Sequence, residues 1–192
     1  MIAVVVPLEL SRIFARCAPA VGPVTMSAIV TYESGGRRYA IGDNTIRRSF
    51  FPADRERAEA LATQLLRAGH DIDLGYAQIN SSNFTRFGLN ARSAFDPCTN
   101  VATGARILGV AYVGAARTFG EGQVALVHAL SAYNTGGYFA GMSYARGVYA
   151  MAAALHFERR PFVKRTTVKG YSTESGLRAV SFLRARRSPT GR

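Results

Sequence analysis

The sequence predicts a mainly helical α+β domain followed by a separate C-terminal segment. Apolar residues recur at helical spacing across most of residues 9–155, which favours helices over strands. Residues 71–80 interrupt this pattern with polar side chains and a glycine, so we expect a loop or a short strand there. From Phe157 onward the periodicity fades and Arg, Ser, Thr, Gly and Pro accumulate. We therefore expect a single helical domain over residues 1–157 and a basic, flexible tail over residues 158–192.

The individual helices follow from apolar periodicity and from the residues at their ends. The first is expected over residues 9–16, and the second begins near Pro23, because proline suits the first helical turn. In this second helix Met26, Ile29 and Val30 form an apolar stripe, and the carboxylate of Glu33 takes the next position on the same face. The glycines at 35–36 provide its stop signal. Further helices are expected over residues 54–68, 101–115, 124–130 and 143–155, and residues 131–137 are expected to be a helix end that runs into a turn.

The strong positive charge belongs mainly to the tail. The chain has a formal net charge of +12, but residues 158–192 contain ten Lys or Arg against two Glu and so account for +8 of it. A basic tail can attract nucleic acid, anionic lipid or an acidic wall polymer, and charge alone does not separate these. Because the body has no nucleic-acid-reading motif, we expect no nucleic-acid partner. No apolar run approaches the roughly 20 residues that span a bilayer, so we expect no transmembrane segment.

The cysteines and histidines give little support for a metal site. Cys17 and Cys98 are far apart in the chain, and they form either a disulfide in an oxidising compartment or two buried thiols; both alternatives stay open. The three histidines, His70, His128 and His156, show no ligand-like spacing. We therefore expect no metal and no other cofactor.

Glu33 is the first candidate catalytic residue. Its place at the end of an apolar helical face predicts partial burial, and the negative end of the helix dipole lies nearby; both raise the pKa of the carboxyl group. A glutamic acid that keeps its proton near neutrality can deliver it to a glycosidic oxygen. The alternative is an exposed residue in a fraying last turn, and Glu33 alone does not decide between the two.

Three ordered motifs add a family resemblance to this candidate. They are Glu-Ser-Gly-Gly at 33–36, Gly-Tyr-Ala-Gln-Ile-Asn at 75–80 and Ala-Tyr-Asn-Thr-Gly at 132–136, followed by Tyr144 and Val148. In this order they resemble the soluble lytic transglycosylases of the lysozyme-like superfamily, over about residues 15–155. The resemblance implies a lysozyme-like α+β fold with a substrate groove, and peptidoglycan glycan strands as the substrate.

Further motifs narrow the resemblance. Cys-Ala-Pro at 17–19, Phe-Asp-Pro-Cys at 95–98 and the long insert before Gln78 are similar to the peptidoglycan-cleaving component of type IV secretion systems. This implies a periplasmic protein that opens the wall locally during assembly of a secretion or conjugation apparatus, with the tail as a contact for secretion-system subunits. The apolar start at residues 2–6 lacks a preceding basic leader and is a poor secretory signal.

The resemblance implies a reaction in which one protein carboxylate suffices. Glu33 would protonate the oxygen between N-acetylmuramic acid and N-acetylglucosamine. It would then act as a base on the muramyl C6 hydroxyl, and the product would be a 1,6-anhydro sugar. Because the acetamido oxygen of the substrate can stabilise the positive sugar centre, no second carboxylate is needed.

The same resemblance implies that further motif residues bind the substrate. Ser34 would hydrogen-bond the acetamido region, or remain a solvated hydroxyl at a helix end. Gln78 and Asn80 would shape the groove with amides that both donate and accept, or stabilise turns instead. Gly75 would permit the close approach of backbone or substrate.

Two tyrosines and an asparagine complete the implied site. The Tyr133 hydroxyl would orient Glu33, and Asn134 would anchor the turn or the substrate. Tyr144 would close around the catalytic acid, or else be a core aromatic residue.

Two aspartates keep other outcomes open. Asp71 and Asp73 lie in or beside an insert, residues 43–72, whose contribution to the groove edge the sequence does not define. If either faced Glu33 with room for a water, the outcome would be hydrolysis by a muramidase mechanism; otherwise both are exposed loop residues. A third hypothesis is a scaffold protein that binds glycan without cutting it.

Overall fold

The structure, a computed structural model, describes residues 4–157 as a mainly helical body with two small sheets. The helices are α1 (Leu8–Cys17), α2 (Pro23–Ser34), α3 (Arg55–Arg67), α4 (Phe84–Phe87), α5 (Ala91–Ala94), α6 (Pro97–Phe119), α7 (Gln123–Thr135) and α8 (Met142–Ala154), with one 3-10 turn, η1 (Ser81–Asn83). The strands are β1 (Val4–Val6), β2 (Ile41–Asp43), β3 (Arg48–Phe50), β4 (Ile72–Leu74), β5 (Ile79–Asn80) and β6 (Leu155–Phe157). The predicted mainly helical α+β fold is confirmed. The predicted basic tail, residues 158–192, lies outside the described residues.

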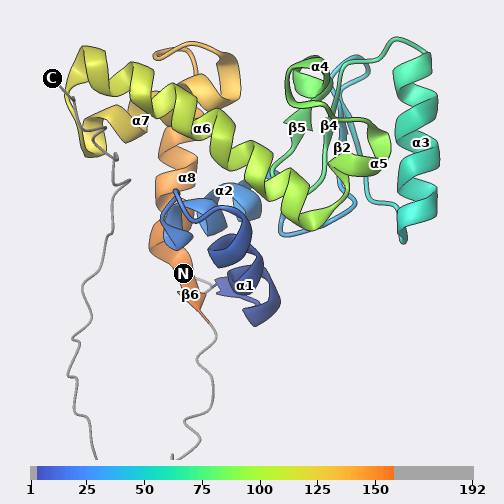
Figure 1. The fold of residues 1–192 in the computed structure, drawn as a ribbon, viewed down its shortest axis with the longest axis horizontal. Coiled ribbons are helices and arrows are strands. Elements are labelled where there is room, and N and C mark those ends of the chain that lie inside the picture. Colours follow the sequence, from blue (N-terminus) through green and yellow to red (C-terminus); the bar gives the residue numbers. More distant parts are fainter. Residues whose placement is uncertain (1–3, 158–192) are drawn as a thin grey trace, which may run out of the picture.

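The long helix α6 connects the two ends of this body. The sheet strands β2, β4 and β5 gather with α3, α4 and α5 at one end of α6, and α7 and α8 lie toward the other (Figure 1). Helix α7 packs against α6, and α8 packs against both α7 and α2. Helix α1 completes the helical part by packing against α6 and α2.

Helix α2 forms as predicted and lies deep in the core. Pro23 is its first residue, and it ends at Ser34 because Gly35 adopts the left-handed conformation with a φ of 62°. The predicted apolar stripe is buried, with Met26, Ile29 and Val30 at most 1% exposed. Burying side chains of this size stabilises the folded state by roughly 1.5–3 kcal/mol each. The last turn of α2 is therefore held against the core and does not fray.

The sheet is larger than the sequence indicates. Residues 71–80, expected as a loop or a short strand, form β4, a turn and β5, and the β2–β3 hairpin is not evident from the sequence. The four strands pair antiparallel in the order β3-β2-β4-β5. Their buried face contains Ile41 paired with Leu74, which also pairs with Ile79. Strands of two or three residues are too short to show alternation, so tertiary packing decides their conformation.

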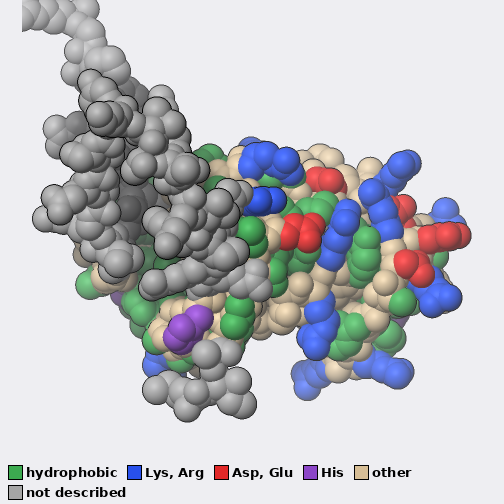
Figure 2. All heavy atoms as spheres, turned by 90° about the horizontal axis from the view of Figure 1, so that it is seen from below, with side chains coloured by type: hydrophobic (Ala, Val, Ile, Leu, Met, Phe, Trp, Pro, Cys, Tyr) green, Lys and Arg blue, Asp and Glu red, His purple; other side chains and the backbone are tan. Residues whose placement is uncertain are grey.

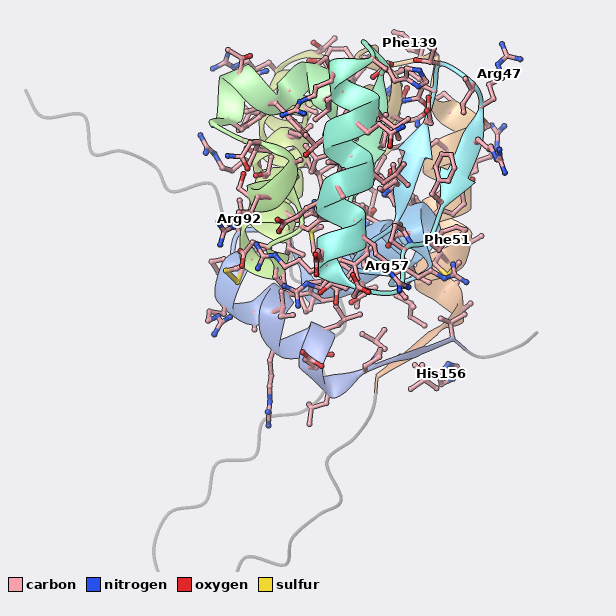
Figure 3. All side chains as sticks on the ribbon, turned by 90° about the vertical axis from the view of Figure 1, so that its right-hand side faces the viewer. Arg47, Phe51, Arg57, Arg92, Phe139 and His156 are labelled. Atoms are coloured by element: carbon pink, nitrogen blue, oxygen red, sulfur yellow. A yellow bond between two sulfur atoms is a disulfide. The ribbon has the colours of Figure 1, made fainter. Side chains whose placement is uncertain are left out.

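The outer edge of the β2–β3 hairpin faces solvent. Figure 3 shows Arg47 and Phe51 along this edge. The surface charges of the described body are mixed in sign, since basic and acidic side chains are interspersed on the face seen from below (Figure 2). This agrees with a sequence in which most of the excess positive charge lies in residues 158–192.

A short parallel pairing joins the two ends of the described chain. Strand β1 pairs with β6, with Val4 opposite Leu155. The sequence predicts neither strand, and it predicts that the last helix reaches residue 155. The helix ends one residue earlier because Leu155 is extended, with a ψ of 135°, and begins β6. Among residues 4–157, no helix is long and apolar enough to cross a membrane.

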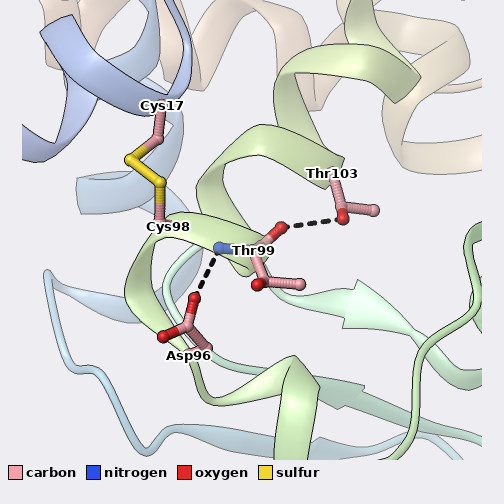
Figure 4. The surroundings of a disulfide bond; sticks show 5 residues. All are labelled: Cys17, Asp96, Cys98, Thr99 and Thr103. Atoms are coloured by element: carbon pink, nitrogen blue, oxygen red, sulfur yellow. Dashed lines mark hydrogen bonds between the residues drawn. A yellow bond between two sulfur atoms is a disulfide. The ribbon is translucent and has the colours of Figure 1, made fainter.

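A disulfide between Cys17 and Cys98 links α1 to the first turn of α6 (Figure 4). Their Cα atoms are 5.3 Å apart, and of the two alternatives for these cysteines the structure has the bridge. The turn that carries Cys98 is well defined, because the Asp96 side chain accepts a hydrogen bond from the Thr99 N–H at 2.8 Å and caps α6. The bridge closes a loop that contains both α2 and the four-stranded sheet.

Candidate active site

A groove of about 750 Å³ lies between the four-stranded sheet and helices α2, α6 and α7, and this volume suits a small-ligand or oligosaccharide site. Residues from all three sequence motifs line it, namely Glu33, Gln78, Asn80, Tyr133 and Asn134. The aspartates Asp71 and Asp73 line its sheet side. Segments far apart in the sequence therefore meet at one cavity, as the motifs predict.

Glu33 occupies the helical wall of this groove in a partly buried position. Burial raises the pKa of its carboxyl group to about 7, and the negative charge of Asp73 acts in the same direction. A hydrogen bond from the Tyr144 hydroxyl to Glu33 Oε1, at 2.6 Å, opposes this by favouring the carboxylate. The elevated pKa agrees with the sequence-based prediction, and it lets Glu33 hold or release a proton near neutrality.

The tyrosine whose hydroxyl donates a hydrogen bond to Glu33 is Tyr144 and not Tyr133. The Tyr133 hydroxyl donates instead to the main-chain carbonyl of Ala77, at 2.8 Å. This corrects the expectation that Tyr133 orients Glu33, because its single hydroxyl proton is used by the turn between β4 and β5. Tyr144 is 6% exposed, and the ring of Tyr32 packs edge-on against its ring with the two centroids 5.3 Å apart. This packing holds the phenol in place.

Ser34 stabilises the fold at the edge of the site. Its side chain is 3% exposed, and its hydroxyl lies 2.9 Å from the carbonyl oxygens of both Val30 and Tyr76. The predicted contact with a substrate acetamido group is therefore not supported, because the hydroxyl is buried and its proton is shared between main-chain acceptors. The contact to Tyr76 attaches the end of α2 to the second motif.

The second motif forms a turn that is held by a residue outside all three motifs. Asn100, on α6, accepts a hydrogen bond from the Ala77 N–H and donates to the carbonyls of Leu74 and Ala94, each at 2.8 Å. Gly75 has a φ of 79°, and a Cβ atom there would collide with Asn100 Nδ2. The close approach predicted for Gly75 is thus to Asn100 and to the main-chain carbonyl of Ala94, and Gly75 does not line the groove. No spacing in the sequence identifies Asn100, because its partners are main-chain atoms of distant segments.

The amides of the second motif also bind protein atoms. Gln78 has a φ of 44°, and its Nε2 donates to the carbonyls of Gly75 and Ala40 at 2.8 and 3.2 Å. Asn80 Nδ2 donates to Asp71 at 2.6 Å and to Asp73 at 3.0 Å. Both amides line the groove, and the structure shows the turn-stabilising contacts that were the alternative for them; substrate binding by Gln78 and Asn80 stays a prediction.

Asp73 places a second carboxylate in the groove. It accepts hydrogen bonds from Asn44 Nδ2 at 2.8 Å and from Asn80. Burial raises the pKa of Asp73, the two amide bonds lower it, and the neighbouring charge of Asp71 raises it. Both aspartates were expected to be exposed loop residues. Asp71 is exposed but lines the groove, whereas Asp73 is partly buried and lines the groove as well.

A hydrogen bond between Asp43 and His70, outside the groove, holds the hairpin that carries Asn44. Asp43 is 2% exposed, and its carboxylate lies 2.7 Å from His70 Nδ1 and accepts the N–H groups of Thr45 and Ile46. The pair joins the end of β2 to the segment that leads into β4. His70 thus has a positioning role that its sequence spacing does not reveal.

A partly buried carboxylic acid with a pKa near neutrality, facing a groove that carries a second carboxylate, is the arrangement found in enzymes that cleave glycosidic bonds. Residues 12–150 match the transglycosylase SLT domain, and the chain belongs to this family. No solved structure gives a significant match to the chain.

The related proteins share the name virB1, and the Brucella relatives are named as type IV secretion system proteins. The chain is 39% identical over 145 residues to "Protein virB1" of Agrobacterium fabrum, an alignment that covers 74% of the chain and 59% of that protein. It is 34% identical over 182 residues to "Type IV secretion system protein virB1" of Brucella abortus, covering 92% of the chain and 76% of that protein. The chain thus spans about three fifths of the length of the Agrobacterium relative.

Proposed function

We propose that this protein is a lytic transglycosylase that cleaves the β-1,4 bond between N-acetylmuramic acid and N-acetylglucosamine in peptidoglycan. The observation that carries the proposal is the Glu33 carboxyl group, which lines the groove, has a pKa of about 7 and accepts a hydrogen bond from Tyr144. Membership of the transglycosylase SLT domain family supports the same chemistry.

The proposed reaction uses Glu33 twice. In its protonated form it donates its proton to the glycosidic oxygen, the bond to the muramyl C1 breaks, and Glu33 becomes a carboxylate. The acetamido oxygen of the substrate stabilises the positive charge at C1. The carboxylate then takes the proton of the muramyl C6 hydroxyl, whose oxygen bonds to C1 and closes the 1,6-anhydro ring. Each turnover therefore returns Glu33 to its starting protonation state.

Tyr144 suits this cycle because its hydroxyl donates a hydrogen bond to the Glu33 carboxylate without giving up its proton. Burial and the nearby Glu33 charge raise the pKa of Tyr144, so the phenol keeps its proton throughout. The hydrogen bond to Oε1 stabilises the carboxylate formed after the first step and fixes the side-chain rotamer. Tyr144 is thus a positioning residue in the proposed mechanism.

The cellular role that we propose is local opening of the cell wall during assembly of a type IV secretion or conjugation apparatus, in the periplasm. The printed name of the Brucella relative, a type IV secretion system protein, supports this setting. The basic residues at 158–192 are the proposed contact for other secretion-system subunits.

Replacing the acid tests the chemistry directly. Glu33→Gln keeps the side-chain volume but cannot release or take up a proton, so we expect release of soluble muropeptides to fall by at least ~10³-fold while binding to sacculi persists. Mass spectrometry of the wild-type products should show 1,6-anhydro ends. Wild-type activity retained by Glu33→Gln would refute the assignment. Binding without cleavage by both proteins would favour the scaffold hypothesis instead.

Hydrolysis by a muramidase mechanism is the second candidate function. Asp73 favours it, because this carboxylate lines the same groove and its charge acts on Glu33. In hydrolysis a water attacks C1 and leaves a reducing end, so the mass of the product separates the two reactions. Reducing ends in the wild type that disappear in Asp73→Asn would establish this alternative.

A further inference from the structure

We propose that Arg86 and Arg106 form a carboxylate-binding site at one end of the groove, which recognises the peptide stems that branch from the glycan. This inference rests on the proposed function, since it assigns the part of peptidoglycan that the groove reads beyond its sugars. The site combines two guanidinium groups, one aromatic ring and two small polar side chains.

The two arginines come from different elements and meet at Phe87. Arg86, on α4, and Arg106, on α6, place their guanidinium carbons 5.3 and 5.1 Å from the centroid of the same Phe87 ring. Stacking on an aromatic face restricts a guanidinium while leaving its N–H donors free to bind a ligand. Two cations are thus held in place before any ligand arrives.

Arg86 connects this pair to the groove. It is the only Lys or Arg among the described residues that line the cavity, whose lining also includes Glu33, Asp71 and Asp73. Asp71 and Asp73 both accept hydrogen bonds from the Asn80 amide. Within residues 4–157, the ion pairs join Arg55 to Glu59, Arg57 to Asp54 and His70 to Asp43, so neither Arg86 nor Arg106 is neutralised by a carboxylate of the described chain.

The surroundings of Arg86 suit a short peptide better than a sugar. Ser82 and Asn83 precede Arg86 by four and three residues and line the same cavity, so they offer a hydroxyl and an amide beside the guanidinium. On the facing helix, Ile107 and the 56% exposed Val110 provide an apolar surface next to Arg106. Cations, amide-binding groups and an apolar patch together match a peptide that has carboxylates and methyl side chains.

The chemistry of peptidoglycan supplies this ligand. Its sugar chain is neutral and gives two guanidinium groups nothing to pair with. The peptide stem is attached to the lactyl group of the muramyl residue, extends sideways from the glycan and ends in free carboxylates. A guanidinium binds a carboxylate through charge-assisted hydrogen bonds with two parallel donors.

The test compares two substrates that differ only in their stems. Uncrosslinked glycan strands are used intact, or after an amidase has removed every peptide and the lactyl carboxylates left by this hydrolysis have been converted to neutral methylamides, and kcat/KM is measured for each. We expect Arg86→Gln/Arg106→Gln to lower kcat/KM about tenfold on the intact strands and less than twofold on the denuded ones. Because screening weakens exposed charge pairs, the tenfold loss should shrink at high salt.

Arg117→Gln is the matched control. Arg117 is an exposed residue of α6 outside the lining of the groove, and its replacement removes a positive charge from the same helix. It should leave both substrates unaffected. Equal losses by the double variant on both substrates, or no loss on either, would overturn the proposed stem site.

A binding measurement separates this inference from the proposed function. In the Glu33→Gln background no cleavage is required, and the equilibrium binding of intact and denuded strands can be compared with and without the two arginine substitutions. A preference for intact strands that the substitutions abolish supports the stem site even if the wild type proves inactive. An inactive wild type with this preference intact would contradict the proposed function alone, whereas the absence of any preference for stems would contradict the stem site.

Discussion

The groove has a helical wall, formed by α2, α6 and α7, and a sheet wall, formed by the four-stranded sheet, and the two walls hold their carboxylates in different ways. On the helical wall, Glu33 is partly buried and accepts a hydrogen bond from Tyr144, and burial outweighs this bond, so its pKa rises to about 7. On the sheet wall, Asp73 is also partly buried, but Asn44 and Asn80 donate amide hydrogen bonds that counteract the burial. The pKa of Asp73 is also raised above its ordinary value, with burial as the largest cause, but the two amide hydrogen bonds offset part of this rise. The comparison shows how the number of hydrogen-bond donors around a partly buried carboxyl group sets how far burial raises its pKa.

The first prediction concerns the cost of burying Glu33 and has the largest expected effect. Because its pKa is raised from 4.5 to about 7 on folding, the folded protein binds more protons than the unfolded chain between these values, and stability falls as the pH rises across this window. Glu33→Gln carries no such cost. The variant should exceed the wild type by about 2 to 3 kcal/mol in free energy of unfolding above pH 7.

Denaturant unfolding at pH 5 and pH 8 measures this difference. The gain should be largely lost at pH 5, where the wild-type carboxyl group is protonated in the folded state. A gain that is the same at both pH values would show that burial does not control Glu33.

The second prediction separates the two tyrosines on the helical wall. Tyr144→Phe removes the hydrogen bond that lowers the pKa of Glu33, so the alkaline limb of the pH–rate profile should move to higher pH. The rate should also fall about tenfold, because the carboxylate formed in the first step loses its donor. Both effects are read from kcat/KM measured across the pH range.

Tyr133→Phe is the matched control for Tyr144→Phe. It leaves the carbonyl of Ala77 without its donor and should cost about 1 kcal/mol of stability without moving the alkaline limb. If Tyr133→Phe shifted the limb and Tyr144→Phe did not, the original expectation for Tyr133 would be restored.

The third prediction tests whether the charge of Asp73, on the sheet wall, affects the pKa of Glu33, on the helical wall. Its expected effect is the smallest. Asp73→Asn removes a negative charge that raises the pKa of Glu33, so the alkaline limb should move to lower pH by a few tenths of a unit. This is opposite in direction to Tyr144→Phe. The introduced amide would retain an acceptor for one of the two neighbouring amides, and a circular dichroism melt checks that the sheet is intact. An unmoved limb would mean that the two carboxylates are electrostatically independent.

Local sequence patterns predicted the helical wall well. The apolar stripe of α2, its proline start and its glycine stop are all encoded within residues 23–36, so they place Glu33 at the end of a buried face without knowledge of the rest of the chain. The raised pKa follows from that placement. The three motifs also indicate which distant segments meet at the groove.

The same patterns do not predict the partners of individual polar groups. Ser34 and Gly75 belong to motifs, but one is buried against Tyr76 and the other against Asn100. The choice between Tyr133 and Tyr144 depends on how α7 and α8 are rotated against α2 and the β4–β5 turn. A motif specifies that these residues are present, but not which of their atoms form hydrogen bonds with one another.

The sequence by itself determined the helical class of the fold, the position of Glu33 and the set of segments that form the groove. The first two depend on periodicity and on helix end signals, which act over a few residues, whereas the set of segments was implied by the resemblance of the three motifs to a known family. Only the tertiary structure decided that Tyr144 contacts the acid, that Asn44 and Asn80 stabilise Asp73, and that Arg86 and Arg106 meet on one ring. These contacts join segments that are distant in the chain, and their hydrogen-bond and stacking geometry exists only after the helices and the sheet have packed.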